Sequence, residues 1–337
     1  MGMAHAKAFA ALPEYRLVAG CDLDAARLAE FAAAFPGAAA VGDCARMLSD
    51  HAPQVVVVAT PTASHARLAL AAIEAGARGV FCEKPMAVNL GDARRVVEAC
   101  RKRSCALVVN HQRRCDRVYR TMRGLIEAGK IGKVELIRGS CAGDMLSDGT
   151  HTIDSIRSLA GDTAVKWVFG QICRDPVPPG EPRGAGYDAS GGWRYGHPIE
   201  SGAMAVFEFA TGLRAEVFTG RMQPRGRRYQ DIEVCGTTGR IWRAGDQAGD
   251  TLLIEDASAG GWHAVAALEA ADPGFIPRQF ARMILGGEPH PLGGGSALAD
   301  QEIVMAVHES ARLRAPVALP LAQERYPLEL MIEAGAL

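Results

Sequence analysis

Three residues of the sequence have side chains that could move a proton: Lys84, His151 and Asp148. Lys84 lies in the stretch GVFCEKPMAV, where an apolar run typical of a buried strand ends at the motif Glu-Lys-Pro. A lysine at such a strand end places its ammonium in a cleft, where loss of water lowers the pKa and suits the amine to proton transfer. Pro85 then fixes the direction in which the chain leaves the strand. The alternative is a solvent-exposed lysine, the commoner situation for this residue type.

The second group of candidate residues lies in the stretch GDMLSDGTHTIDSIRSLAG. Asp148, His151 and Asp154 are three residues apart, so at the start of a helix they could share one face. Oxidation of an alcohol requires removal of the hydroxyl proton, which a neutral histidine oriented by a carboxylate can accept. We therefore expect His151 to be the base, Lys84 its polarising partner and Asp148 the orienting carboxylate. The alternative is that Asp148 or Thr150 only caps the helix.

The elements that must position these residues differ between the two parts of the chain. The first third alternates helix-like and strand-like segments, and Val55–Val58 is an apolar run typical of a strand buried on both faces. This alternation predicts a parallel sheet with helices on both faces. Later segments are strand-like, and the sequence around 210–212 predicts a hairpin. We expect an α/β, Rossmann-like doubly wound domain over 1–114, followed by an α+β domain with a large, mostly antiparallel open sheet over 115–337.

A long loop separates two of the later strands. Residues 174–198 are rich in proline and glycine, and a loop of this length in a compact domain is usually a lid or is disordered. We favour a lid. Four of its side chains could stack on a sugar or hydrogen-bond to one: Trp193, Arg194, Tyr195 and His197.

Residues that end parallel strands deserve particular weight, because ligands of such sheets bind beyond the carboxyl ends of the strands. Asp22 ends the predicted strand YRLVAGCD, where its carboxylate could accept hydrogen bonds from both ribose hydroxyls of an adenosine. A carboxylate there repels a 2′-phosphate, and Leu23 supplies no arginine to bind one, so we expect NAD rather than NADP. The alternative is that Asp22 caps the next helix, although Asp24 is better placed to do so.

Gly2 is the counterpart of Asp22 in a dinucleotide site. It lies about 20 residues earlier and directly precedes a helix, the position of the last glycine in G-x-G-x-x-G. The first strand and the two earlier glycines of that unit are absent from the sequence. The strand normally lies in the middle of the sheet, so its loss would leave buried backbone groups unpaired at roughly 1–3 kcal/mol each. Two explanations are a start assigned too late and a truncated form with impaired cofactor binding, and we favour the first.

Four stretches together resemble the glucose–fructose oxidoreductase, inositol dehydrogenase and rhizopine-catabolism (Gfo/Idh/MocA) family: MGMAHAKAF, ATPTASHARLALAAIEAG, FCEKPMAV and ALADQEIVMAVHESARLRAPVALPL. The resemblance runs across nearly the whole chain, and Glu-Lys-Pro after a strand of the nucleotide domain is quite specific in that context. It implies an oxidoreductase, dimers or tetramers, and a cis bond before Pro85. The family pattern has an acid four residues before the histidine, where this chain has Ser147, so the resemblance leaves the role of Asp148 open.

The strand-end argument and the resemblance together give the residues expected to line the cofactor. They are Gly2, Asp22, Thr60, Pro61, Thr62, His65, Glu83, Lys84 and Arg113. For His65 we favour packing at the start of a helix over a cofactor contact. Arg113 and Arg114 could contact substrate or nicotinamide, or could instead form an ion pair between the domains.

Composition excludes several classes of partner. A formal net charge of −1 gives no electrostatic reason to expect nucleic acid or a membrane surface. No apolar run approaches the length of a membrane span, and the N-terminus lacks the profile of a signal peptide. Nine cysteines without a C-x-x-C argue against a disulfide framework or a metal site and favour reduced thiols in the cytoplasm.

These observations predict an NAD-dependent oxidoreductase that transfers a hydride between nicotinamide and a secondary alcohol or ketone of a sugar or an inositol-like polyol. An open sheet with an uncovered apolar face also predicts a homodimer or homotetramer. The alternatives are an NAD-using glycoside hydrolase on the same scaffold, a reductase of a small imine or tetrapyrrole-like compound, and a non-catalytic nucleotide- or sugar-binding regulator.

Overall fold

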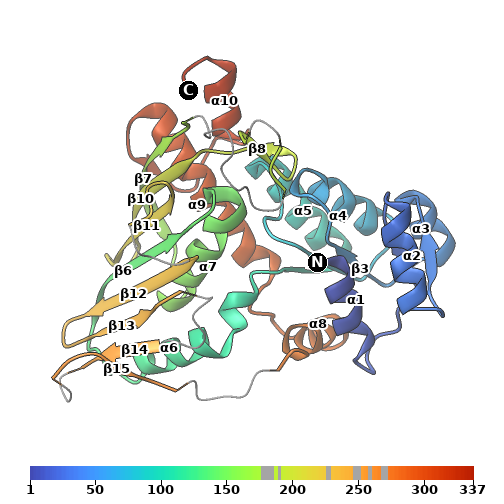
Figure 1. Cartoon of the computed structure of the whole chain (residues 1–337), viewed down its shortest axis with the longest axis horizontal. Helices are drawn as coiled ribbons and strands as arrows, with labels where there is room; N and C mark the ends of the chain where they lie inside the picture. Colours follow the sequence, from blue (N-terminus) through green and yellow to red (C-terminus); the bar gives the residue numbers. More distant parts are fainter. Residues whose placement is uncertain (176–185, 189–190, 225–228, 246–251, 257–259, 267–271) are drawn as a thin grey trace.

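The protein has two halves that lie side by side (Figure 1). One half is built on short parallel strands near the N-terminus, and the other on a large sheet from the middle of the chain. The computed structural model describes residues 1–175, 186–188, 191–224, 229–245, 252–256, 260–266 and 272–337.

The first half alternates strands and helices, as the sequence predicts. Its apolar runs form the strands, and β4 is buried at every position because helices cover both faces. The strands are β1 (Ala19–Cys21), β2 (Ala39–Val41), β3 (Val55–Val58), β4 (Gly79–Cys82) and β5 (Ala106–Val109). The helices are α1 (Gly2–Ala10), α2 (Ala25–Ala34), α3 (Cys44–His51), η1 (Thr62–Ser64), α4 (His65–Glu74) and α5 (Leu90–Arg103).

The parallel strands of this half form two separate groups. β3, β4 and β5 pair in that order, and β1 pairs only with β2. Among the described residues, no strand joins β1 to β3. This gap lies where the sequence analysis places the missing first strand of a dinucleotide-binding sheet.

The second half contains a nine-stranded sheet with the order β15-β14-β13-β12-β6-β11-β10-β7-β16. Its neighbours are antiparallel except for the parallel pair β6 and β11, so the predicted mostly antiparallel sheet is confirmed. The predicted hairpin is the β10–β11 turn, where Gly212 has φ +85°. The strands are β6 (Val134–Cys141), β7 (Val165–Cys173), β10 (Gly202–Phe209), β11 (Arg214–Gly220), β12 (Gln230–Gly236), β13 (Arg240–Arg243), β14 (Leu252–Glu255), β15 (His263–Ala264) and β16 (Val317–Ala318).

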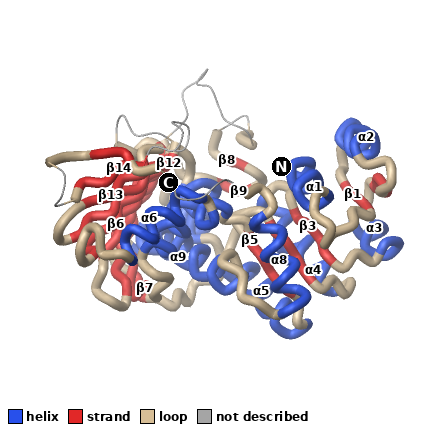
Figure 2. Tube along the Cα trace, turned by 90° about the horizontal axis from the view of Figure 1, so that it is seen from below, coloured by secondary structure: helices blue, strands red, loops and turns tan. Residues whose placement is uncertain are grey.

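Helices cover one face of this sheet (Figure 2). Alternate side chains of β10, from Ala203 to Phe209, point into this layer and are fully buried. The helices of this half are α6 (Arg117–Glu127), η3 (Met145–Gly149), α7 (Thr150–Leu159), α9 (Gly294–Leu313) and α10 (Pro327–Glu333), and η2 (Gln112–Cys115) links it to the first half. The longest, α9, buries Asp300 and His308 among its apolar residues, and no described helix has the length and apolar character needed to cross a membrane.

One late helix does not follow the predicted division of the chain. Helix α8 (Phe275–Gly286) lies within 115–337 but packs on the first half, where Phe280 contacts Phe81 at a ring distance of 6.0 Å. The first residue of β4 is Gly79, and a larger residue would not fit there, because its Cβ would lie 2.8 Å from the Phe280 ring. The predicted single boundary at residue 114 does not account for α8, which follows it in sequence but packs on the first half.

Candidate active site

Lys84 leaves the carboxyl end of β4 and extends toward the second half of the molecule. Its Nζ donates to the carbonyl oxygen of Ser147 at 2.5 Å and lies 3.8 Å from Oδ1 of Asp148. The peptide bond between Lys84 and Pro85 is cis, as the resemblance implies. With 18% of its side chain exposed, Lys84 is therefore an interdomain residue and not a solvated surface lysine.

Burial and most of the neighbouring charges act in opposite directions on the pKa of Lys84, and the net effect lowers it. Burial is the main cause that lowers the pKa of Lys84 below its usual value. The carboxylates of Asp148 and Glu83 oppose this shift, whereas the positive charge of Arg194 adds to it. An amine with a lowered pKa can exchange a proton with a substrate hydroxyl near neutral pH.

His151 lies in the first turn of α7, directly after the π-helical turn η3. Asp144 caps η3 by accepting from the Ser147 amide at 2.7 Å, and Glu200 accepts from the Met145 amide at 2.5 Å. His151 is 4% exposed, and its Nδ1 has no hydrogen-bond partner among the described residues. Burial, followed by the positive charge of Lys84, lowers the pKa of His151 well below its usual value, so the ring is neutral.

Asp148 does not orient His151 as the sequence analysis expects. Its Oδ2 accepts from Nη1 of Arg194 at 2.6 Å, and its Oδ1 accepts from the Tyr229 hydroxyl at 2.6 Å and faces Lys84. Although burial opposes it, the charges of Lys84 and Arg194 lower the pKa of Asp148. The helix spacing of three brings Asp148 near the site, but its carboxylate neutralises cations there instead of holding the imidazole.

Tyr229 is a site residue that the sequence analysis missed. It directly precedes β12, and the guanidinium carbon of Arg113 lies 5.2 Å from the centroid of its ring, in a cation–π contact. Arg113 therefore lies against Tyr229, whose hydroxyl donates to Asp148.

A short hairpin, β8 (Trp193–Arg194) with β9 (His197–Pro198), lies between the two halves (Figure 2). The Arg194 guanidinium lies 4.9 Å from the centroid of the Tyr187 ring and 5.0 Å from that of Tyr195, and it also donates to Asp144 at 3.0 Å. The Tyr195 carbonyl accepts from the Ala63 amide of the first half at 3.3 Å. This hairpin therefore contacts both halves, next to the carboxylates of Asp144 and Asp148.

The other predicted lid residues have different surroundings. His197 is fully buried, with Nε2 3.3 Å from the Ser147 hydroxyl, so it supports the η3 turn. Trp193 is 43% exposed. The rest of the predicted lid, 176–185 and 189–190, lies outside the described residues.

The cofactor-side residues follow β3 and β4. Glu83 accepts from Asn110 at 2.9 Å and pairs with Nε2 of His5 at 2.6 Å, which fixes the strand end beside Lys84. Thr60 and Pro61 are exposed at the end of β3, where they can contact a ligand. Thr62 is buried, at 3% exposure.

His65 has a structural position. Its Nδ1 lies 2.7 Å from the Pro85 carbonyl and its Nε2 lies 2.7 Å from the Thr60 carbonyl. Both ring nitrogens are thus engaged, and the side chain is buried. The favoured packing interpretation agrees with this geometry, because His65 holds together the two loops that follow β3 and β4.

Asp22 and Gly2 lie where an adenosine and a pyrophosphate would be expected. Asp24 caps α2 by accepting from the Ala26 amide at 2.8 Å, which leaves Asp22 free of that task. The Asp22 side chain is 38% exposed at the carboxyl end of β1, so its carboxylate can receive ribose hydroxyls. Gly2 begins α1, and a Cβ there would meet Ala59 only at 3.9 Å. The residues present on this edge therefore fit a dinucleotide with an unphosphorylated ribose.

For Arg113 and Arg114 the sequence allowed either a ligand contact or an ion pair between the domains. Arg114 forms such an ion pair. Its Nε donates to Asp154 at 2.9 Å and its Nη1 donates to Asp162 at 2.8 Å. Because Arg114 is buried, these bonds fix the end of the nucleotide half against α7.

Comparison with known proteins gives the class to which this fold and site belong. Residues 1–111 match the family model described as "Oxidoreductase family, NAD-binding Rossmann fold", and residues 119–242 match the GFO/IDH/MocA C-terminal domain. The chain therefore belongs to the Gfo/Idh/MocA family of NAD-binding oxidoreductases. The resemblance stated from the sequence motifs is confirmed.

Several individual proteins are similar to this chain. Myo-inositol 2-dehydrogenase of Thermotoga maritima is 26% identical over 315 residues, which cover 87% of this chain and 88% of the relative. Levoglucosan dehydrogenase of Pseudarthrobacter phenanthrenivorans is 27% identical over 280 residues, 72% of this chain and 70% of the relative. A levoglucosan dehydrogenase structure in complex with NADH and levoglucosan shares the fold, with a TM-score of 0.75 and 22% identity over 95% of this chain and 97% of that chain.

Proposed function

We propose that the protein is an NAD-dependent dehydrogenase that oxidises a secondary alcohol of a cyclic polyol or sugar, or catalyses the reverse reduction. The observation that carries this proposal is the position of Lys84, a buried amine at the end of β4 that faces Asp148 of the second half at 3.8 Å. The names of the two relatives similar over most of their length, a myo-inositol and a levoglucosan dehydrogenase, support a cyclic polyhydroxy substrate.

In the proposed reaction the cofactor and the residues of the site have separate tasks. When bound, NAD supplies the nicotinamide that accepts the hydride. Asp22, Thr60 and Pro61 would hold the cofactor, because they lie at the carboxyl ends of β1 and β3. The protein itself binds and orients the substrate hydroxyl and removes its proton.

The pKa directions favour Lys84 over His151 as the group that takes the proton. Burial lowers the pKa of Lys84 from a high value toward neutrality, whereas burial lowers the pKa of His151 from an already lower value. A neutral Lys84 can accept the hydroxyl proton, and Asp148 then stabilises the resulting ammonium at 3.8 Å. His151 stays neutral and positions the hydroxyl by a hydrogen bond. This reverses the roles that the helix spacing had predicted.

The test is a rate assay with the purified protein. Formation of NADH is followed by absorbance with NAD or NADP and a panel of myo-inositol, other cyclitols, levoglucosan and free hexoses. We expect turnover with at least one cyclic secondary alcohol, and a kcat/KM for NAD at least about 10-fold above that for NADP, because Asp22 repels a 2′-phosphate.

Two results of this assay would contradict the proposal. Tight NADH binding without turnover on the whole panel would favour the non-catalytic regulator. Release of a free sugar from a glycoside without net NADH would favour the glycoside hydrolase.

A further inference from the structure

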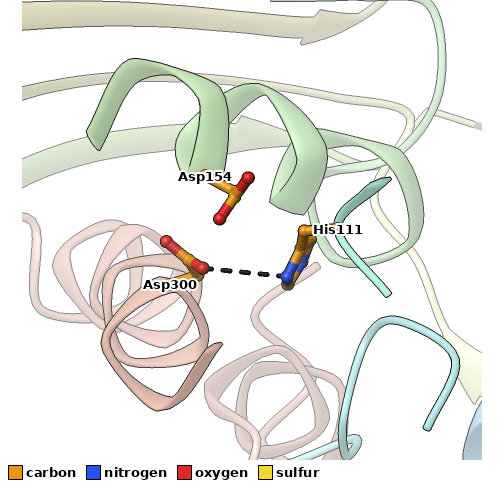
Figure 3. Close-up of side chains that lie close together, drawn as sticks. All are labelled: His111, Asp154 and Asp300. Atoms are coloured by element: carbon orange, nitrogen blue, oxygen red, sulfur yellow. Dashed lines mark ion pairs between the residues drawn. The ribbon is translucent and has the colours of Figure 1, made fainter. Parts of the chain in front are cut away.

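Three buried ionisable side chains that have no part in the proposed reaction lie close together (Figure 3). His111 follows β5, Asp154 is on α7, and Asp300 is on α9. One ligand-type atom from each lies within 4.8 Å of the others, and all three residues are at most 2% exposed. Three elements from distant parts of the chain therefore bring two carboxyl groups together inside the protein.

The hydrogen bonds of these carboxyl groups leave one oxygen of each without a donor. Oδ1 of Asp154 accepts from Arg114 at 2.9 Å, and Oδ1 of Asp300 accepts from Nη1 of Arg157 at 2.6 Å. The Oδ2 atoms of Asp154 and Asp300 are buried and have no hydrogen-bond partner among the described residues. Two ionised oxygens in such a place would repel each other and remain unsolvated, which is strongly unfavourable.

The charges around the pair show what can satisfy these two oxygens. Arg114 and Arg157 contribute two positive charges, and Asp154, Asp300 and Asp162 contribute three negative charges if all are ionised. One bound proton makes this group neutral. A divalent cation would instead leave a net positive charge in the interior, next to two guanidinium groups that already use the same carboxylates.

We propose that Asp154 and Asp300 share one proton, so that the pair is a buried acid with a single negative charge. The proton lies between the two carboxyl groups, so that one carboxyl donates a hydrogen bond to the other. The proposal is independent of the substrate and of the NAD-dependent reaction.

The shared proton has a consequence for His111. Its Nδ1 lies 3.8 Å from Oδ2 of Asp300, its Nε2 is 2.9 Å from the Thr150 hydroxyl, and its ring meets the His151 ring at a centroid distance of 5.6 Å. Burial lowers the pKa of His111 to about 4, and the Asp300 charge opposes this shift. With the proton on the carboxyl pair, His111 faces one negative charge and stays neutral, so no imidazolium forms beside His151.

The test is infrared difference spectroscopy of the full-length protein at about pH 7, in H₂O and after refolding in D₂O. The wild type is compared with Asp154→Asn, with Asp300→Asn, and with the control Asp50→Asn, which also loses an ion pair with an arginine but lies on α3, outside the charges counted around the pair. We expect a deuterium-sensitive C=O band of a protonated carboxyl that is missing from both pair variants and retained in the control. Loss in both variants identifies a shared proton, because each single replacement leaves the remaining aspartate ionised.

Other outcomes overturn the proposal. Difference spectra that contain only bands of ionised carboxylates show that the pair carries no proton. One equivalent of a divalent metal in the purified wild type, found by elemental analysis and missing from Asp154→Asn, shows a cation site instead. If one variant does not fold, the spectrum of the other variant still shows whether the pair carries a proton, and the metal analysis of the wild type still shows whether it binds a cation.

Discussion

At the scale of single residues, one carboxylate, that of Asp148, faces two cations and a hydroxyl group. Asp148 accepts from Arg194 at 2.6 Å and from Tyr229 at 2.6 Å, and Lys84 lies farther away at 3.8 Å. Because Arg194 and Tyr229 already engage Asp148, the carboxylate stabilises the Lys84 ammonium less than it would alone. The guanidinium also lowers the pKa of the amine, an effect that sequence spacing did not indicate.

Replacing Arg194 by Gln should shift the pH dependence of the reaction. Burial is the main cause of the lowered pKa of Lys84, and the Arg194 charge lowers it further. Without that charge the pKa of Lys84 rises, so the free amine forms only at higher pH. We expect the acidic limb of the kcat/KM profile for alcohol oxidation to move up by roughly half to one pH unit.

Arg194→Lys serves as the matched control for this experiment, because it keeps a positive charge at the same position. It should move the acidic limb less than Arg194→Gln does. An unchanged profile in Arg194→Gln, or a shift to lower pH, would show that the guanidinium does not control the amine.

At the scale of elements, most helices and strands were predicted from the sequence, but the long-range packing of α8 was not. The apolar run before Glu83-Lys84-Pro85 is β4, and the 210–212 turn is the β10–β11 hairpin. The packing of α8 on the first half was not predicted, because its partner Phe81 lies about two hundred residues earlier and local periodicity carries no such information. The hairpin β8–β9 was predicted only as a loop, because its strands are two residues long.

Truncation of Phe280 should test the role of α8. Phe280 is fully buried against Phe81, so Phe280→Ala should destabilise the protein by about 3–5 kcal/mol through lost burial and a cavity. Urea unfolding followed by circular dichroism measures this change. Leu285→Ala on the same helix is the control, since Leu285 is 71% exposed and its loss should cost less than about 0.5 kcal/mol. Equal effects of the two variants would show that α8 does not stabilise the first half.

At the scale of the whole molecule, the large sheet leaves one face without covering helices (Figure 2). Register places the outward side chains of neighbouring strands next to one another on this face, and several are apolar and only partly buried. They are Trp167, Phe169, Met204, Val206 and Phe218. An apolar sheet face of this kind is commonly covered by a second copy of the chain, which supports the predicted homo-oligomer.

Light scattering coupled to size exclusion measures this association. We expect a mass of at least twice that of one chain, and a shift toward the monomer in Val206→Arg, which places a charge in the middle of the face. Thr211→Arg, at the exposed turn of the same hairpin, should leave the mass unchanged. A monomeric wild type at micromolar concentration would contradict the prediction.

The candidate site was predicted from the sequence only in part, for a physical reason. Lys84, Asp148 and His151 were found because each follows a local pattern, a strand end or a helix start. Two of the contacts that affect the charge of Asp148 come from Tyr229 and Arg194, which are distant in the chain and show no periodic signal. Residue types and spacing indicated which groups take part, but the order of their pKa values depends on burial and on neighbouring charges.

The most direct test of the account is the rate of hydride transfer in a Lys84→Ala variant, measured by stopped flow with saturating NAD and the best alcohol of the panel. Because we propose that Lys84 accepts the hydroxyl proton, we expect the rate to fall at least about 100-fold while NADH affinity stays within a few-fold. Lys84→Arg should be similarly slow, since a guanidinium cannot lose its proton at neutral pH. A near-normal rate in Lys84→Ala would contradict the proposed site.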